Sequence, residues 1–332
     1  MSRFKIVITD FGAPDNELEE AELRASGLEY ELVRLNARSA EELIPHVRDA
    51  HALIVQWAPI SRPVIDALQK CRVISRYGIG VDMIDLEAAG ERGIPVCNVP
   101  DFCIDEVSTH TLAFILALNR HLVAHHQHVV AGNWGGPPGG APERLSRQTL
   151  GVLGLGKIGS EVARKAKGVG LRVLAYDPYQ KPDQAEKLGV EMVSLEDLLR
   201  QSDYLSIHCP LTKETRHLIG SKELGRMKPS ACLINMARGP VVDQAALHAA
   251  LAGGIIAGAA VDVLEQEPPR PDDPLLKLPN VLFTPHTSSW SAESTLQLRR
   301  DVARNVVQVL RGDPPRAVVN QQALRAAAGS NR

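Results

Sequence analysis

The feature that most constrains this chain is a set of three closely spaced glycines near its middle. They run from the end of an apolar segment, residues 149–155, into the start of an expected helix over residues 158–167. Glycine lets the chain turn tightly, lets a phosphate approach the backbone and lets helix and strand pack closely. The amides at a helix start also attract anions. The pattern predicts that a dinucleotide pyrophosphate binds here, a ligand-free turn being the alternative. The predicted cofactor contacts are Gly154, Gly156, Lys157, Ile158 and Gly159.

An acidic residue stands where the second strand of such a nucleotide-binding unit would end. Asp177 follows the strand-like segment 172–176, about twenty residues after the first glycine. A carboxylate at this place accepts hydrogen bonds from the ribose hydroxyls of a dinucleotide. It also repels the 2′-phosphate of NADP, and the next residues, Pro178 and Tyr179, bring no positive charge to neutralise that phosphate. The sequence therefore predicts NAD as the cofactor.

Short apolar segments alternate with amphipathic ones along the whole chain of 332 residues. This alternation is typical of strand–helix units that build parallel sheets. Because the glycine turn lies near the middle, a complete unit of about 100 residues precedes it. We expect an α/β protein with two doubly wound parallel-sheet domains. A central Rossmann NAD-binding domain would span residues 101–290, and a flavodoxin-like substrate domain would combine residues 1–100 and 291–332. Crossings near Pro100 and Trp290 would serve as hinges.

Composition argues against several other classes of protein. Hydrophobic residues make up 44% and charged residues 23%, and a net charge of −2 offers no basic surface for nucleic acid. The five cysteines are scattered without a C-x-x-C pair, which argues against a disulfide framework and against a thiolate zinc site. No apolar run reaches the roughly 18 residues of a membrane span, and no signal peptide is expected. We expect a cytoplasmic protein without nucleic-acid or membrane partners.

Ionisable side chains follow three strand-like segments in the second half of the chain: Arg238, then Asp262 with Glu267, then His286. Ligands bind beyond the carboxyl ends of parallel strands, so all four are expected on the cofactor side. Reduction of a 2-keto acid needs a cation for the carboxylate, which Arg238 supplies, and a proton donor, which His286 supplies. Glu267 would orient the imidazole and favour its charged form. Singly, each side chain is explained as a surface charge or turn residue, but together they predict hydride-transfer chemistry.

Three segments carry a resemblance to a known family. They are LGVLGLGKIGSEVA at residues 150–163, MKPSACLINMARGPVVDQAAL at 227–247, and VDVLEQEPP at 261–269 followed by FTPH at 283–286. The chain resembles the D-isomer-specific 2-hydroxyacid dehydrogenases over nearly its whole length. The resemblance implies that Arg238 binds the substrate carboxylate and that Glu267 and His286 form the acid–base pair. It also implies further cofactor contacts: Thr111 near the nicotinamide, Asp262 on its carboxamide side, Cys209 and Pro210 at the adenine, and Thr215 and Ala237.

A glycine-containing segment in the first hundred residues resembles the family loop that holds the substrate carboxylate through main-chain amides. The resemblance implies substrate contacts from five consecutive residues: Arg76, Tyr77, Gly78, Ile79 and Gly80. Arg76 matches the position that faces the distal phosphate in phosphoglycerate dehydrogenases. A simple ion pair with a local acid is the alternative for Arg76.

The segment after the histidine departs from the family pattern. Most relatives have small glycines there, whereas this chain has residues 287–290, Thr-Ser-Ser-Trp, so the substrate stays open. Other features, such as Val96-Cys-Asn-Val-Pro100, resemble the C-terminal-binding-protein branch, which contains NAD-sensing corepressors. Two alternatives therefore accompany the D-2-hydroxy acid dehydrogenase: an NADH-sensing binding module with little turnover, and an oxidoreductase acting on a phosphorus oxyacid.

Histidines cluster on a helix expected to run from residue 105 past residue 121. His121, His125 and His128 share one helical face, and histidines four apart can chelate zinc. A polar helix face or a subunit interface explains them more simply, so no metal site is predicted. Family members commonly dimerise through helices of the nucleotide domain, which implies a homodimer.

Overall fold

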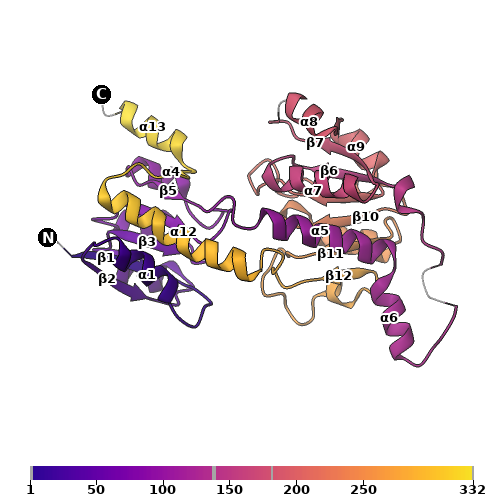
Figure 1. The fold of residues 1–332 in the computed structure, drawn as a ribbon, viewed down its shortest axis with the longest axis horizontal. Coiled ribbons are helices and arrows are strands. Elements are labelled where there is room, and N and C mark those ends of the chain that lie inside the picture. Colours follow the sequence, from indigo (N-terminus) through magenta and orange to yellow (C-terminus); the bar gives the residue numbers. More distant parts are fainter. Residues whose placement is uncertain (1–2, 137–139, 181, 331–332) are drawn as a thin grey trace. The chain divides into compact units, whose positions relative to one another are not determined.

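The computed structural model of the chain describes residues 3–136, 140–180 and 182–330. It divides into two compact units, one made of Met1–Phe102 and Ser291–Arg332 and the other of Cys103–Trp290. Each unit has its own parallel sheet (Figure 1). Residues 1–2 and 331–332, which belong to the predicted substrate domain, lie outside the described residues.

The sheet of the first unit has the strand order β2-β1-β3-β4-β5, and every pair is parallel. This order is that of flavodoxin-like sheets, in which ligands bind where the order reverses, between the first and third strands. The elements of the unit are β1 Phe4–Ile8, α1 Glu17–Ala25, β2 Tyr30–Arg34, α2 Ala40–Val47, β3 Ala52–Val55, α3 Arg62–Ala67, β4 Val73–Arg76, α4 Leu86–Glu91, β5 Val96–Cys97, α12 Ala292–Arg311 and α13 Gln321–Ser330.

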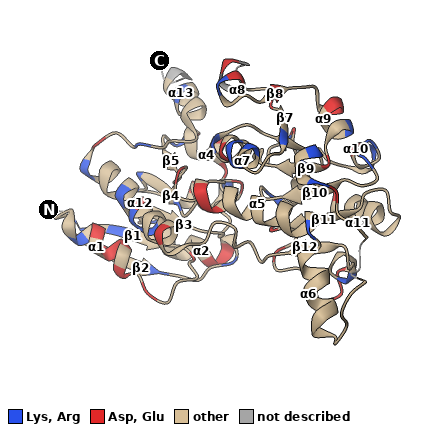
Figure 2. Ribbon diagram, turned by 45° about the vertical axis from the view of Figure 1, so that its right-hand side comes forward, with Lys and Arg blue, Asp and Glu red and all other residues tan. Residues whose placement is uncertain are grey.

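Helices cover both faces of this sheet. Successive strand residues point to opposite faces, so Val7 and Leu53 join a core with α2, α3 and α4. On the other face α12 packs against β3, β4 and α1 (Figure 1). Acidic α1 and basic α12 are also joined by charge, since Arg304 pairs with Glu22 at 3.0 Å (Figure 2). The C-terminal helix α12 therefore completes the N-terminal sheet.

The sheet of the second unit has the order β12-β11-β10-β9-β6-β7-β8, again all parallel. Helices α5 and α7 pack together on it, and α9, α10 and α11 contribute to a separate buried cluster. The elements are α5 Ile104–Asn119, α6 Leu122–Val130, η1 Leu145–Arg147, β6 Thr149–Leu153, α7 Lys157–Gly168, β7 Arg172–Tyr176, α8 Pro182–Leu188, β8 Glu191–Met192, α9 Leu195–Gln201, β9 Tyr204–Ile207, α10 Ser221–Leu224, β10 Cys232–Asn235, η2 Gly239–Val241, α11 Gln244–Ala252, β11 Gly258–Val261, η3 Pro274–Lys277 and β12 Val281–Phe283.

This order is that of a Rossmann fold with one more strand, and the order reverses between β6 and β9. The predicted fold class, a Rossmann unit with a flavodoxin-like unit, is confirmed. The reversal places the ends of β6 and β9 at the crevice where such sheets bind dinucleotides.

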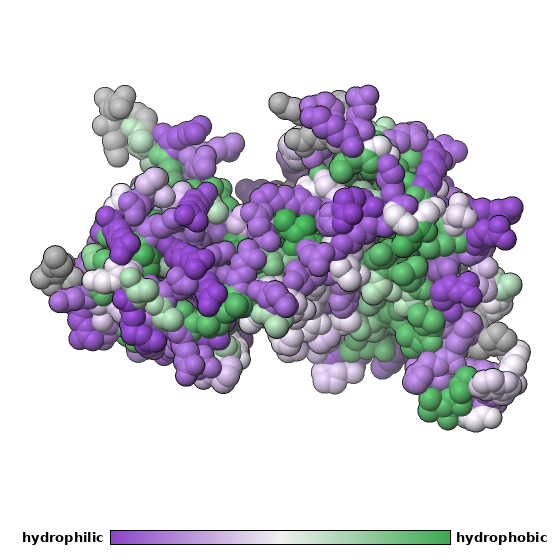
Figure 3. Space-filling view, in the orientation of Figure 1, coloured by the Kyte–Doolittle hydropathy of each residue, from purple (hydrophilic) through white to green (hydrophobic). Residues whose placement is uncertain are grey.

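One predicted helix is interrupted. Helix α5 ends at Asn119, and His121 adopts a left-handed backbone with φ 50° before α6 begins. The helix therefore does not continue past residue 121 as predicted, because a left-handed residue breaks the α-helical hydrogen-bond ladder. No residue of α6 is buried, and apolar side chains show on its surface in Figure 3.

Candidate active site

The three glycines form a tight turn between β6 and α7. Gly154 has φ 95°, and a Cβ there would lie 2.7 Å from the amide nitrogen of Cys209. A Cβ on Gly159 would lie 2.0 Å from the carbonyl oxygen of Gly154, so side chains are excluded at both positions. Around Gly156, by contrast, a Cβ would meet no described atom within 4 Å. The turn is thus closed toward the protein and open at Gly156, as a backbone that receives a pyrophosphate must be.

Asp177 lies at the end of β7 beside this turn. Its Oδ2 accepts a hydrogen bond from the amide of Leu155 at 2.9 Å, and its Oδ1 accepts one from the amide of Tyr179 at 2.9 Å. The carboxylate therefore also holds the glycine turn in place. A carboxylate oxygen has two lone pairs, so these bonds leave acceptor capacity for a ribose hydroxyl.

The turn after β9 lies against the glycine turn through Cys209. Thr215 Oγ1 donates to the carbonyl of Pro210 at 2.6 Å and closes the turn on itself. Burial raises the pKa of Cys209 to about 11, so this side chain is a neutral thiol. The neighbouring His208 bonds Ser206 Oγ through Nε2 at 2.8 Å, and burial lowers its pKa to about 3. A neutral imidazole beside the predicted adenine pocket was not anticipated from the sequence.

His286 and Glu267 are in direct contact. His286 Nδ1 lies 2.6 Å from Glu267 Oε2, and Glu267 Oε1 accepts a hydrogen bond from the amide of Leu264 at 2.9 Å. The histidine backbone has φ 55°, a left-handed conformation that is costly for a residue other than glycine and is often found at functional sites. The pair matches the arrangement of an acid–base histidine oriented by a carboxylate.

Asp262 supports the turn that carries His286. Its buried carboxylate accepts hydrogen bonds from Thr284 Oγ1 at 2.6 Å and from the amide of Thr287 at 2.9 Å, with further bonds from the amide of Ser288. Thr284 Oγ1 also lies 3.2 Å from His110 Nε2 of α5. His110 and Thr284 are contacts that the sequence analysis missed, because only the fold brings residues 174 positions apart together.

Arg238 and Ala237 lie in the turn between β10 and η2. Arg238 Nη1 donates to the carbonyl of Ala237 at 2.8 Å, and Asn235 Nδ2 donates to the carbonyl of Arg238 at 2.9 Å. A Cβ on Gly239 would lie 2.0 Å from the carbonyl carbon of Leu264. The Arg238 turn is therefore packed against the loop that leads to Glu267.

Thr111 lies fully buried in α5, and its Oγ1 donates to the carbonyl of Val107 at 2.8 Å. The hydroxyl thus has a partner in its own helix.

In the first unit, the turn after β4 presents main-chain donors. Among the described residues, none accepts a hydrogen bond from the amides of Ile79 and Gly80. Arg76 folds over this turn, so that a Cβ on Gly78 would lie 1.6 Å from its Nη1. Tyr77 faces inward and donates to Glu19 at 3.1 Å. A guanidinium beside two available amides is an arrangement that attracts an anion.

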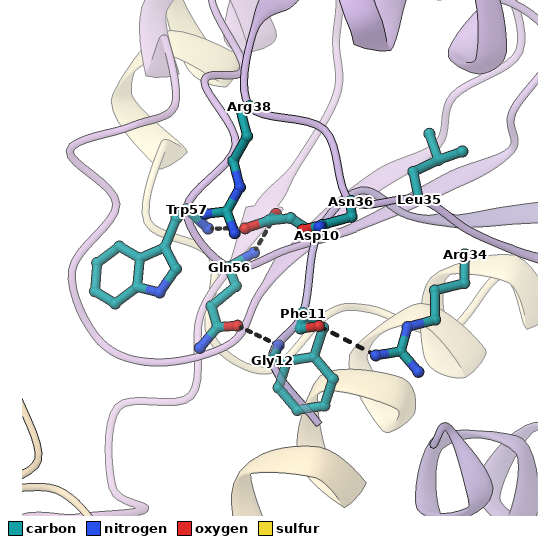
Figure 4. A pocket seen from close by; sticks show the side chains of 9 residues that line it. All are labelled: Asp10, Phe11, Gly12, Arg34, Leu35, Asn36, Arg38, Gln56 and Trp57. Atoms are coloured by element: carbon teal, nitrogen blue, oxygen red, sulfur yellow. Dashed lines mark hydrogen bonds between the residues drawn. The ribbon is translucent and has the colours of Figure 1, made fainter. Parts of the chain in front are cut away.

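A pocket of about 440 Å³ lies beside this turn in the same unit (Figure 4). Its wall includes Trp57, whose ring centroid is 5.2 Å from the guanidinium carbon of Arg76. Buried Asp10 joins two segments of the lining, because it accepts hydrogen bonds from the amides of Gln56 at 3.1 Å and Trp57 at 2.6 Å. The lining residues are Asp10, Phe11, Gly12, Arg34, Leu35, Asn36, Arg38, Gln56 and Trp57.

No helix among the described residues is long and apolar enough to span a membrane. In the same part of the chain, no group of three or more histidine, cysteine or acidic side chains is placed to hold a metal ion. His121 and His125 have ring centroids 5.8 Å apart.

The sequence and the fold of this chain are similar to those of known proteins. Residues 112–288 match the model of the D-isomer specific 2-hydroxyacid dehydrogenase NAD binding domain. The chain is 43% identical to a glyoxylate reductase from Korarchaeum cryptofilum, covering 86% of this chain and 88% of the relative. It is 40% identical to a D-3-phosphoglycerate dehydrogenase from Archaeoglobus fulgidus over 90% of this chain, which spans 56% of that relative's length. A solved D-lactate dehydrogenase from Aquifex aeolicus, complexed with NAD and lactic acid, superposes with a TM-score of 0.85 at 29% identity, covering 93% of this chain and 96% of the other.

The two parallel-sheet units and the nucleotide turn define an oxidoreductase whose cofactor is NAD. The chain belongs to the D-isomer-specific 2-hydroxyacid dehydrogenase family, as the resemblance of its motifs implied.

Proposed function

We propose that the protein reduces a small 2-keto acid to the D-2-hydroxy acid with NADH, and catalyses the reverse oxidation. The observation that carries the proposal is the 2.6 Å contact between His286 and Glu267. The loop that carries Glu267 is packed against the Arg238 turn. These three side chains follow neighbouring strands β10, β11 and β12, whose carboxyl ends share one edge of the sheet.

Each of the three side chains has a defined task. NADH supplies the hydride when it is bound. Arg238 binds the substrate carboxylate, because a guanidinium matches two carboxylate oxygens in one plane. His286 gives its proton to the carbonyl oxygen as that oxygen becomes an alkoxide. Glu267 fixes the orientation of the imidazole ring, so that the proton is aimed at the substrate.

The first unit contributes the remaining substrate contacts through the turn at Arg76–Gly80. The amides of Ile79 and Gly80 and the guanidinium of Arg76 together suit an anionic group. Tyr77 and Gly78 complete the turn, Tyr77 by anchoring it to Glu19. On this basis we assign Met1–Phe102 with Ser291–Arg332 as the substrate domain and Cys103–Trp290 as the NAD-binding domain.

The nucleotide contacts are assigned to the glycine turn with Lys157 and Ile158, to Asp177, and to the turn with Cys209, Pro210 and Thr215. Thr111, Ala237 and Asp262 are proposed on the nicotinamide side. We expect NAD to be preferred over NADP, because the Asp177 carboxylate would repel a 2′-phosphate.

We further propose a cytoplasmic homodimer. None of the five cysteines, all of which the structure describes, forms a disulfide bond, as is usual for proteins in a reducing compartment. Helix α6 and the segment after it expose apolar side chains, among them Val130 at 72% and Trp134 at 89%. Such a patch is typical of a protein–protein interface, and a second copy of this unit is the proposed partner.

A turnover assay tests the function. Glyoxylate, pyruvate and hydroxypyruvate are each offered with NADH, and NADH oxidation is followed by absorbance. Wild-type protein should turn over at least one of them, and Arg238→Ala should lose most of kcat/KM while binding NADH with an unchanged Kd. Tight NADH binding without turnover would overturn the proposal and favour the sensing module instead.

A further inference from the structure

A second acid–histidine pair lies within the second unit, and its acid belongs to the loop that carries Glu267. His217 Nε2 lies 2.7 Å from Glu265 Oε1. Gln244, the first residue of α11, donates its amide to the same oxygen at 3.3 Å, and its Oε1 accepts the amide of Glu265 at 3.0 Å. Glu265 is therefore held by both its main chain and its side chain. We call His217, Gln244 and Glu265 the Glu265 clamp.

Both partners of Glu265 are themselves anchored. Gln244 Nε2 donates to Asp273 Oδ2 at 2.7 Å, and the amide of His217 donates to the carbonyl of Pro240 at 2.8 Å. His217 has φ 53°, a left-handed backbone that persists in a residue other than glycine only where its surroundings enforce it. The clamp is thus tied to Pro240, two residues after Arg238.

The clamp sits directly against the Arg238 turn. A Cβ on Gly239 would lie 2.0 Å from the carbonyl carbon of Leu264 and 2.4 Å from the amide nitrogen of Glu265. At this point the two backbones pass with no room for a side chain between them. Any shift of Glu265 would therefore change its spacing from the turn that carries Arg238.

The backbone at Leu264 and Glu265 also orients the carboxylate of Glu267. The amide of Leu264 donates to Glu267 Oε1 at 2.9 Å, and the other carboxylate oxygen meets His286 Nδ1 at 2.6 Å. The direction of the Glu267 carboxylate toward His286 is consequently set by the backbone at Leu264 and Glu265, which the clamp holds.

We propose that His217, Gln244 and Glu265 are positioning residues, which fix the acid–base pair Glu267–His286 relative to Arg238. The inference rests on the proposed function, since it concerns the same side chains. Displacing reacting groups by about 1 Å can lower a rate on the order of 100-fold, so a loosened clamp should be visible in kcat.

Two substitutions of Glu265 distinguish the effect of its hydrogen bonds from the effect of its negative charge. Glu265→Ala removes the acceptor for His217 and Gln244, whereas Glu265→Gln keeps an oxygen at the same place. We expect Glu265→Ala to lower kcat roughly 10- to 100-fold, with the Kd of NADH within about twofold of wild type, and Glu265→Gln to restore most of the rate. Glu196→Ala is the matched control, because Glu196 is an exposed acid of the same unit, 3.9 Å from Arg226.

Hydrogen exchange gives a readout that needs no turnover. The amide of Leu264 should exchange faster in Glu265→Ala than in wild type and Glu196→Ala, because its bond to Glu267 loses support. If Glu265→Ala does not fold, Gln244→Ala tests the same clamp.

A near-normal kcat in Glu265→Ala would overturn the inference, and so would an equal loss in Glu265→Ala and Glu265→Gln. If wild-type protein reduces no 2-keto acid, the proposed function is wrong, but hydrogen exchange still tests the clamp. Unchanged protection of the Leu264 amide in Glu265→Ala would show that Glu265 does not hold this backbone.

Discussion

His286 Nδ1 lies 2.6 Å from Glu267 Oε2, although the two residues are 19 positions apart and follow different strands. The contact fixes the orientation of the imidazole ring relative to the Glu267 carboxylate. The geometry is set by Asp262 on one side, through Thr284 and Thr287, and by the amide of Leu264 on the other.

Removing either member of this pair should affect chemistry and not cofactor binding. We expect His286→Ala to lower kcat by roughly 100- to 10,000-fold, the usual range for a general acid, and Glu267→Gln to lower it less, because the ring loses its charged partner but keeps a hydrogen-bonding one. Steady-state kinetics with NADH, together with NADH titration by fluorescence, measure both effects. A His286→Ala variant with wild-type kcat would remove the assigned role.

Asp177 should set the choice between NADH and NADPH. Asp177→Asn keeps an oxygen that can accept from the amides of Leu155 or Tyr179 but removes the negative charge. We expect the ratio of kcat/KM for NADH to that for NADPH to fall about tenfold, the effect of roughly 1.4 kcal/mol of lost repulsion. Asp183→Asn, an exposed acid on α8, is the control and should leave the ratio unchanged. An unchanged ratio in Asp177→Asn would contradict the assignment.

His208 should make the protein sensitive to acid. Burial lowers its pKa to about 3, against about 6.5 in an unfolded chain, so the unfolded state binds one more proton between these values. Its contribution to stability is fully present above pH 6.5 and is lost as pH falls from 6.5 toward 3, at up to about 1.4 kcal/mol per pH unit.

Urea denaturation at pH 7.5 and pH 5 checks this contribution of His208. His208→Gln cannot titrate in this range, so the free energy of unfolding of that variant should fall less on acidification than that of wild type. Equal losses in the two proteins would show that His208 does not have a lowered pKa in the folded protein.

The apolar surface of α6 should be the dimer interface. Changing Val130 and Trp134 together to lysine adds charge to side chains that are 72% and 89% exposed, so folding should be unaffected. Sedimentation should show a dimer for wild type and a monomer for the double variant. Val169→Lys, on an apolar residue that is 38% exposed in the same unit, is the control. A wild-type protein that sediments as a monomer at micromolar concentration would refute the proposed dimer.

Much of the nucleotide-binding unit could be predicted from local sequence. The apolar strand, the spaced glycines and the acid after β7 act within one strand–helix–strand unit, where near neighbours decide the conformation. Gly154 and Gly159 are fixed in type because a Cβ would strike backbone 2.7 Å and 2.0 Å away. Two elements of the first unit are harder to predict from local sequence. The edge strand β2, Tyr30–Arg34, has exposed charged side chains, and helix α2 contains Pro45.

The sequence by itself determined the fold class and the cofactor, because periodicity and turn chemistry act over short stretches of chain, and it predicted the residue types of the candidate site. Only the tertiary structure decided which of these residues touch. Three sets of contacts depend on parallel strands that bring distant turns to one edge of the sheet. Glu267 contacts His286, Asp262 binds Thr284, and Glu265 binds His217 and Gln244. Such contacts have no signature in sequence spacing, because the strand order that creates them is set by the packing of the whole sheet.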